Sequence, residues 1–165
     1  MQNFDFSDMD DLYREIILDH YRSPRNQQEL AEIDIETEGI NPFCGDEVYL
    51  KMKLVDGLVN GVSFRGVGCS ISQASASMLT EVIKGKSLDE AEEIYLLFRE
   101  MMQGKDPSDE ELETLGEVES LAGVKKFPIR IKCAMLSWAA LEEGIKSHRK
   151  SAAESESGAT ERAAF

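Results

Sequence analysis

The sequence predicts an α+β fold in which helices cover one face of a small antiparallel sheet of three strands. Residues 48–54 alternate apolar and polar side chains, which is the two-residue period of a strand with one buried face. Other segments instead repeat apolar residues at the three- and four-residue spacing of amphipathic helices. With 165 residues, 42% of them hydrophobic, we expect one domain over residues 1–148 and a disordered C-terminal tail over 149–165.

The first helix is predicted to begin at a capping box in Ser7–Asp10 and to end at Ser23–Pro24. His20 lies on the apolar face of this helix, and we interpret it as a hydrogen-bonded packing residue rather than a metal ligand. Residues 25–40 are polar and irregular, with one short strand predicted at Ile33–Thr37.

The two longer strands are predicted on either side of a tight turn. One strand follows Asp46, Asp56–Gly57 indicates a hairpin turn, and residues 59–67 return as the antiparallel partner. Helical periodicity begins directly after Cys69. The Cys69 thiol is therefore expected at a helix N-terminus, where the helix dipole favours a thiolate.

Two long helices and a short one are expected in the second half of the chain. Ser87–Glu90 forms a capping box for a helix that ends at Gly104. The acidic composition of residues 106–123 predicts an excursion over the surface, with a short helix that begins in 107–111. The last helix is predicted to begin near Pro128 and to end near His148, because no apolar periodicity remains beyond that point.

Composition limits the classes of partner. The formal net charge of −14 opposes binding to nucleic acid or to an anionic membrane; it suits a basic protein partner or only a solvated surface. No apolar run approaches the about 20 residues of a membrane span, and the first residues form no signal pattern, so we expect a cytoplasmic protein. Three widely spaced cysteines fit a reducing compartment, with thiols free or bound to a metal.

A thiol and a carboxylate, Cys44 and Asp46, flank Gly45, which lets the backbone turn so that both side chains can point to one volume. Cys69 and Cys133 lie at other predicted breaks in secondary structure. Together the four residues offer three sulfurs and one oxygen, which suits tetrahedral zinc and also iron–sulfur chemistry. Their wide spacing is no compact metal-binding signature, so buried free cysteines remain an alternative interpretation.

Six short motifs are spread along most of the chain. They are Leu12–Tyr21, Pro24–Asn26, Asn41–Asp46, Gly68–Ser77, Met101–Gly104 and Phe127–Cys133. Jointly they resemble the SufU group of the IscU/NifU-like family of iron–sulfur cluster assembly proteins, over roughly residues 9 to 147.

The resemblance implies a function and a set of site residues. Its metal ligands fall on Cys44, Asp46, Cys69 and Cys133, and all four are present. It implies a zinc-dependent sulfurtransferase that accepts persulfide sulfur from a SufS-type, pyridoxal-phosphate-dependent cysteine desulfurase and serves a downstream iron–sulfur scaffold. Cys44 is then the catalytic thiol that leaves zinc, with a histidine of the desulfurase taking its place. Arg130 either orients a ligand or forms a plain surface salt bridge.

The chain departs from the IscU branch at three places, of which one is the acidic segment before the last cysteine, a SufU-like insertion. Lys132 stands where IscU has a histidine, and Phe127–Ile131 replaces the Leu-Pro-Pro-Val-Lys stretch that recruits a chaperone. These departures argue against a dedicated Hsp70-type partner and against a scaffold role. A scaffold that builds a [2Fe–2S] cluster on the same cysteines remains the alternative function, and a non-catalytic zinc-stabilised binding module is a third.

Overall fold

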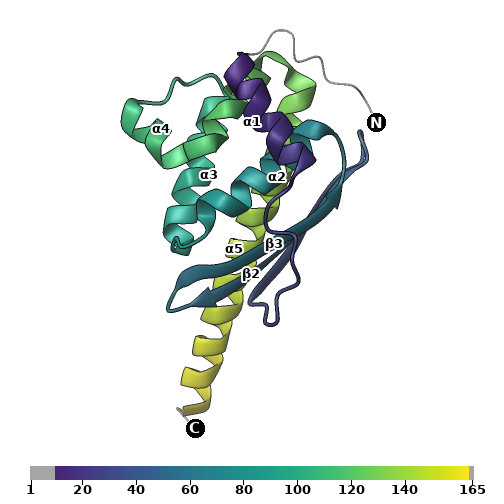
Figure 1. The fold of residues 1–165 in the computed structure, drawn as a ribbon. Coiled ribbons are helices and arrows are strands. Elements are labelled where there is room, and N and C mark those ends of the chain that lie inside the picture. Colours follow the sequence, from purple (N-terminus) through teal and green to yellow (C-terminus); the bar gives the residue numbers. More distant parts are fainter. Residues whose placement is uncertain (1–9, 164–165) are drawn as a thin grey trace.

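A computed structural model describes residues 10–163, with side chains as far as residue 155 (Figure 1). Three antiparallel strands in the order β1-β2-β3 form one sheet, and helices cover one of its faces, which confirms the predicted fold class. The strands are β1 (Ile35–Asn41), β2 (Asp46–Val55) and β3 (Leu58–Val67). The helices are α1 (Asp11–Arg22), α2 (Ser70–Ile83), α3 (Leu88–Met102), α4 (Asp109–Leu115), the 3₁₀ helix η1 (Gly116–Lys126) and α5 (Pro128–Ala163).

Helix α1 is capped by Asp10, whose side chain accepts a hydrogen bond from the Leu12 N–H. Residues 7–9 of the predicted capping box lie outside the described residues. His20 is buried, with Nδ1 2.8 Å from Ser77 Oγ and Nε2 2.9 Å from Glu117 Oε2. The packing role predicted for His20 is therefore confirmed, and it joins α1 to α2 and η1.

Strand β1 lies further along the chain than the predicted Ile33–Thr37, because it pairs with β2 as far as Asn41 opposite Asp46. The turn between β2 and β3 is the predicted one: Asp56 and Gly57 have φ of 52° and 78°, as a type I′ turn requires. The inner face of β2 and β3 is fully buried against the helices and consists of Val48, Leu50, Met52, Val59, Val62 and Phe64.

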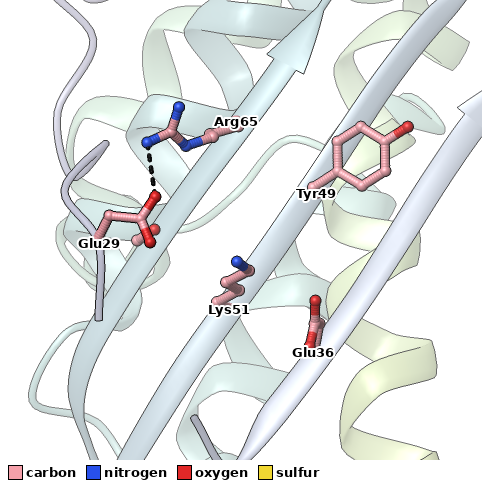
Figure 2. Close-up of a pocket in the computed structure, with 6 residues that line it drawn as sticks. Glu29, Glu36, Tyr49, Lys51 and Arg65 are labelled. Atoms are coloured by element: carbon pink, nitrogen blue, oxygen red, sulfur yellow. Dashed lines mark hydrogen bonds and ion pairs between the residues drawn. The ribbon is translucent and has the colours of Figure 1, made fainter. Parts of the chain in front are cut away.

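The outer face of the sheet is polar, as the alternation along β2 predicts (Figure 2). Its side chains line a shallow hollow of about 200 Å³. Glu29, from the segment before β1, forms an ion pair of 2.9 Å with Arg65 at one side of this hollow. Such a surface is typical of the solvated face of an antiparallel sheet.

Helices α2 and α5 are held together close to the candidate site. Ser75 Oγ on α2 donates to the Ala134 carbonyl over 2.6 Å and accepts from Trp138 Nε1 over 3.0 Å. Ser75, Ala134 and Trp138 are all fully buried. The small residues of α2 permit this close approach, which fixes the start of α2 relative to the start of α5.

The prediction of a surface excursion over residues 106–123 is wrong. Leu115, Val118, Leu121 and Val124 are fully buried in the core. These residues recur every three positions, which is the repeat of a 3₁₀ helix and places them on one side of η1. The acidic residues between them, Glu117 and Glu119, contact His20 and Tyr13 of α1. The acidic composition of the segment therefore hid the buried apolar residues from sequence analysis.

The last helix is longer than predicted. Helix α5 continues past His148 to Ala163, through residues for which the sequence predicts disorder. Lengthening a helix that is already anchored requires no new nucleus, and the alanine and glutamate of this segment are good helix formers. Within residues 10–163, no helix combines the length and the apolar character needed to cross a membrane.

Candidate metal centre

Cys44 lies in the four-residue loop between β1 and β2. Asn41 organises this loop: its carbonyl accepts from the Gly45 N–H over 2.8 Å, and its Oδ1 accepts from the Phe43 N–H over 3.1 Å. Gly45 has a φ of 75°, which glycine adopts without the strain that a Cβ adds. The Cys44 side chain is half-buried at the edge of the core, on a segment outside the sheet.

Asp46 and Cys69 lie in contact at one end of the sheet. Asp46 is the first residue of β2 and is 2% exposed; its Oδ1 accepts a hydrogen bond from the Cys69 N–H over 3.1 Å. Cys69 is the N-cap of α2, and its Sγ lies 3.8 Å from Asp46 Oδ2. A Cβ on Gly68 would come within 2.5 Å of Asp46 Oδ1, so only glycine leaves room for this contact.

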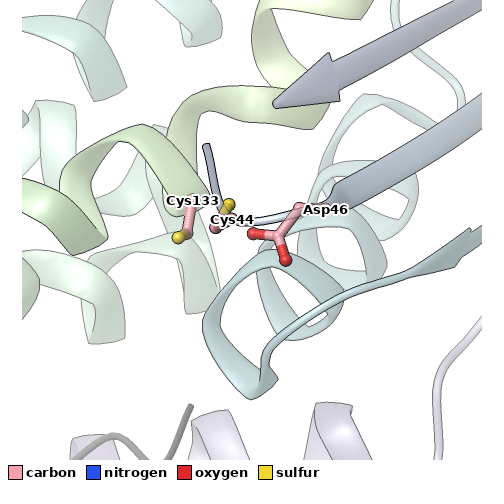
Figure 3. A group of neighbouring side chains, drawn as sticks. All are labelled: Cys44, Asp46 and Cys133. Carbon is pink, nitrogen blue, oxygen red and sulfur yellow. The ribbon is translucent and has the colours of Figure 1, made fainter. Parts of the chain in front are cut away.

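Cys133 completes the group from the second turn of α5, where it is 1% exposed. One ligand atom from each of Cys44, Asp46 and Cys133 lies within 4.8 Å of the other two, and Figure 3 shows the three side chains converging from separate elements. Cys69 adjoins this triad through Asp46. The structure thus brings Cys44, Asp46 and Cys133 together and places Cys69 in contact with Asp46.

This donor set fits a metal ion. Tetrahedral zinc with bonds of about 2.0–2.3 Å holds its ligand atoms about 3.5 Å apart, so Cys44, Asp46 and Cys133, within 4.8 Å of one another, would need only a small contraction. Three thiols and one carboxylate are also the donors that zinc prefers.

The pKa values of the thiols differ because their surroundings differ. A hydrogen bond from the Cys133 thiol and the amides of Ser72 and Ile71 lower the pKa of Cys69 to about 6. The same contact with Cys69, together with burial, raises the pKa of Cys133. Burial raises the pKa of Cys44. Without a metal, Cys69 is therefore the thiolate at neutral pH, as its N-cap position predicts, and Cys44 is a thiol.

Two hollows adjoin Cys44. The first, of about 340 Å³, is lined by Asp46 and Cys69 and by Arg130, which is 9% exposed and therefore not a surface residue. The second, of about 410 Å³, shares Cys44 with the first but none of its other lining residues. It is lined by Asn41, Phe43, Cys44, Pro128, Ile129 and Lys132.

Phe43 and Lys132 form a pair at the second hollow that the sequence did not reveal. The Lys132 ammonium lies 5.7 Å from the centroid of the Phe43 ring, which is 92% exposed. Each residue immediately precedes a candidate ligand, Cys44 or Cys133. This shared position beside a candidate ligand was the only feature of the sequence that could have indicated the pair. The contact itself depends on how the loop packs against α5.

A family model described as the NifU-like N-terminal domain matches residues 12–134. The chain belongs to the NifU-like family. This membership confirms the resemblance drawn from the six motifs, and the match includes all four candidate ligands.

Relatives within the NifU-like family carry two kinds of name. The chain is 50% identical over 139 residues to the zinc-dependent sulfurtransferase SufU of Bacillus subtilis, which covers 84% of this chain and 92% of the relative. It is 42% identical over 141 residues to the iron–sulfur cluster assembly scaffold protein IscU of Streptococcus pyogenes, covering 85% and 86%. A crystal structure from Fervidobacterium islandicum, described as a candidate iron–sulfur cluster assembly scaffold protein for the SUF system (SufU), has a TM-score of 0.74 at 34% identity, covering 79% of this chain and 94% of that one.

Proposed function

We propose that this chain is a zinc-dependent sulfurtransferase that accepts persulfide sulfur from a SufS-type cysteine desulfurase for iron–sulfur cluster assembly. One observation carries the proposal: four donors converge, and of these only Cys44 is half-exposed and on a loop, whereas Asp46, Cys69 and Cys133 are buried. The name of the Bacillus subtilis relative supports it. All three thiols are free, which suits the reducing cytoplasm, where we locate the reaction.

Cys44, Asp46, Cys69 and Cys133 would hold the zinc. Bound zinc would stabilise the thiolate form of its cysteine ligands. Without zinc, the surroundings favour the thiolate only at Cys69, whose pKa is lowered, whereas burial raises the pKa of Cys44. A nucleophilic role for Cys44 at neutral pH therefore agrees with a metal-dependent activity.

The transfer step is a thiol–disulfide type of exchange. The Cys44 thiolate attacks the outer sulfur of the desulfurase persulfide, so that a new bond forms between that sulfur and Cys44 Sγ. The original S–S bond breaks, and its electron pair leaves with the desulfurase cysteine as a thiolate. The proton of the persulfide stays on the transferred sulfur, and nothing is oxidised or reduced overall. The same exchange with a thiol of a downstream scaffold would pass the sulfur on.

The mobility of the four candidates favours Cys44 as the acceptor. Cys69 and Cys133 are held within the first two turns of α2 and α5, and Asp46 is in the β2 ladder. Cys44 is on a four-residue loop next to Gly45, where a change of backbone conformation disturbs no ladder. Arg130, which lines the hollow beside the ligands, would position the carboxylate or the departing thiolate.

A second candidate function is a scaffold that assembles a [2Fe–2S] cluster on the same cysteines. Sulfur-rich donors suit iron–sulfur clusters, and the Streptococcus pyogenes relative is named as such a scaffold. The two functions make different predictions for metal content and for the desulfurase.

Metal analysis combined with mass spectrometry tests the proposal. The full chain, purified anaerobically, should contain about one zinc and no labile sulfide. Incubation with a SufS-type desulfurase and cysteine should add one sulfur atom to Cys44 and raise desulfurase turnover. A stable brown cluster with no effect on turnover would instead support the scaffold. If Cys44→Ala stays folded and still stimulates the desulfurase, the chain acts as a binding module and the proposal fails.

A further inference from the structure

The thiol of Cys44 lies between two hollows with different chemistry. The hollow on the Asp46 side is lined by the buried side chains of Asp46 and Cys69. Its one basic lining residue, Arg130, is buried and already makes contacts of its own. An additional anion in this hollow would be repelled at close range by the Asp46 carboxylate.

The second hollow has no acidic residue in its lining. Phe43, Pro128 and Ile129 provide apolar walls, and Lys132 provides an ammonium group. Within residues 10–155, whose side chains the structure describes, no carboxylate forms an ion pair with Lys132. The face of the Phe43 ring instead holds the ammonium at the hollow, in a cation–π contact of 5.7 Å.

The surrounding charge has the same sign as Lys132. Residues 124–133 contain Lys125, Lys126, Arg130 and Lys132 and no acidic residue, in a chain whose net charge is −14. This segment borders the second hollow through Pro128, Ile129 and Lys132. An anion at Cys44 is therefore better matched in the second hollow than on the ligand side.

The geometry points to the second hollow as the subsite for the persulfide that Cys44 carries after sulfur transfer, with Lys132 as the positioning residue that pairs with the persulfide anion. The inference rests on the proposed function for the origin of this sulfur. A persulfide is one sulfur longer than a thiol and is more acidic. The proton that the transfer step leaves on the outer sulfur is therefore released to water, and the negative charge then lies on that sulfur. Cys44 lines both hollows, so a rotation of its side chain and loop exchanges the ligand side for the Lys132 side. The hollow of about 410 Å³ also leaves room for the thiol that delivers or receives the sulfur.

An equilibrium exchange with a small persulfide tests this without the desulfurase. Zinc-loaded protein is mixed with glutathione persulfide and glutathione, and mass spectrometry of the peptide that contains Cys44 gives the ratio of persulfide to thiol at this residue. Lys132→Gln should lower this ratio about two- to fivefold, the range expected for a partly exposed ion pair. Lys132→Arg should restore it, and Lys126→Gln, which removes an exposed charge from the same segment outside the hollow, should leave it unchanged.

The outcomes separate this inference from the proposed function. An unchanged ratio in Lys132→Gln overturns the subsite, and so does an equal loss in Lys126→Gln, which would reveal a general charge effect. Loss of zinc from Lys132→Gln would assign Lys132 to the metal centre and would also overturn it. If the unaltered chain takes sulfur from glutathione persulfide with the Lys132 dependence but takes none from the desulfurase, the subsite stands and the proposed donor is wrong.

Discussion

The backbone N–H of Cys69 donates a hydrogen bond of 3.1 Å to Oδ1 of Asp46, which joins the N-cap of α2 to the first residue of β2. The bond holds a carboxylate that is 2% exposed and directs its other oxygen to the Cys69 thiol, 3.8 Å away. A buried carboxylate is costly unless it is hydrogen-bonded or paired with a cation. Its position therefore suits a metal ligand better than a purely structural residue.

Substitution of Asp46 by asparagine should weaken zinc binding while the chain stays folded. The amide oxygen can still accept from the Cys69 N–H, but the negative charge is lost. We expect the zinc Kd to rise at least about tenfold, an effect that even outer partners of metal ligands reach. Competition with a fluorescent zinc chelator measures the Kd.

Asp34→Asn is the matched control, because Asp34 also accepts a backbone hydrogen bond, from Leu54, but lies at the other end of the sheet. Equal effects in the two variants would contradict a ligand role for Asp46.

Substitution of Gly68 by alanine should damage the site through space alone. The added Cβ would lie 2.5 Å from both Asp46 Oδ1 and Ser72 Oγ, so one of these groups must move. We expect a loss of about 1–3 kcal/mol in the free energy of unfolding and weaker zinc binding. Denaturant unfolding and zinc titration measure the two effects.

Gly61→Ala is the control for this prediction. Gly61 is also in β3, but its added Cβ would meet the flexible end of Leu30 at 3.3 Å, which can shift. A Gly68→Ala protein with unchanged zinc affinity would show that the carboxylate is not held where the metal needs it.

Sequence patterns predicted the elements whose signals are local. The alternation in residues 48–54 gave β2, and the start of helical periodicity after Cys69 gave the N-cap of α2. Strand β1 was misplaced because Glu38, Gly39 and Asn41 have low strand propensity, and only their pairing with β2 makes them a strand. The stripe of η1 was missed because its three-residue repeat lies within an acidic segment.

The four candidate ligands could be named from the sequence because each belongs to a motif. The unequal burial of these ligands could not be predicted, because Cys44 differs from Cys133 in burial only through the packing of a loop against a helix. The second hollow also depends on two segments, around Phe43 and Lys132, that are far apart in the chain. Such features require the assembled tertiary structure.

In the metal-free protein, one thiolate should form near pH 6. The pKa of Cys69 is lowered to about 6, so its thiolate should be present above that pH and disappear as the pH falls through it. The ultraviolet absorbance of thiolate during a pH titration measures this step. Cys133→Ala should raise the Cys69 pKa, because it removes the hydrogen bond that is its largest cause, whereas Cys44→Ala should leave the step in place. A first thiolate that forms only near the ordinary cysteine pKa of about 8.5 would contradict the prediction.

Stability should also depend on pH through Tyr13. Its hydroxyl donates to Glu119 Oε1 over 2.6 Å and ties α1 to η1, and this bond raises the pKa of Tyr13 to about 12. Because the folded-state pKa is raised, the stabilisation is complete below the unfolded value of about 10 and is lost as the pH rises through about 12. Tyr13→Phe should therefore destabilise the chain by about 1 kcal/mol at pH 8 and by almost nothing near pH 12, as measured by denaturant unfolding.

Tyr49→Phe is the control for Tyr13→Phe, since the exposed hydroxyl of Tyr49 bonds only to Glu47 on the same strand. A Tyr13→Phe effect that does not change with pH would show that packing, not the hydrogen bond, is responsible.

Removal of Cys44 and removal of Cys133 should have different consequences for the metal-free chain. Cys44 is half-buried on a loop, so Cys44→Ala should change the free energy of unfolding by less than about 0.5 kcal/mol. Cys133 is 1% exposed in the core, so Cys133→Ala should cost about 1–2 kcal/mol through lost packing. Unfolding in the presence of a zinc chelator measures both values.

In the zinc-loaded chain, both variants should bind zinc more weakly, but only Cys44→Ala removes the thiol that accepts sulfur. If Cys44→Ala destabilises the metal-free chain as much as Cys133→Ala does, Cys44 is a packing residue, and its loop lacks the freedom that sulfur transfer requires.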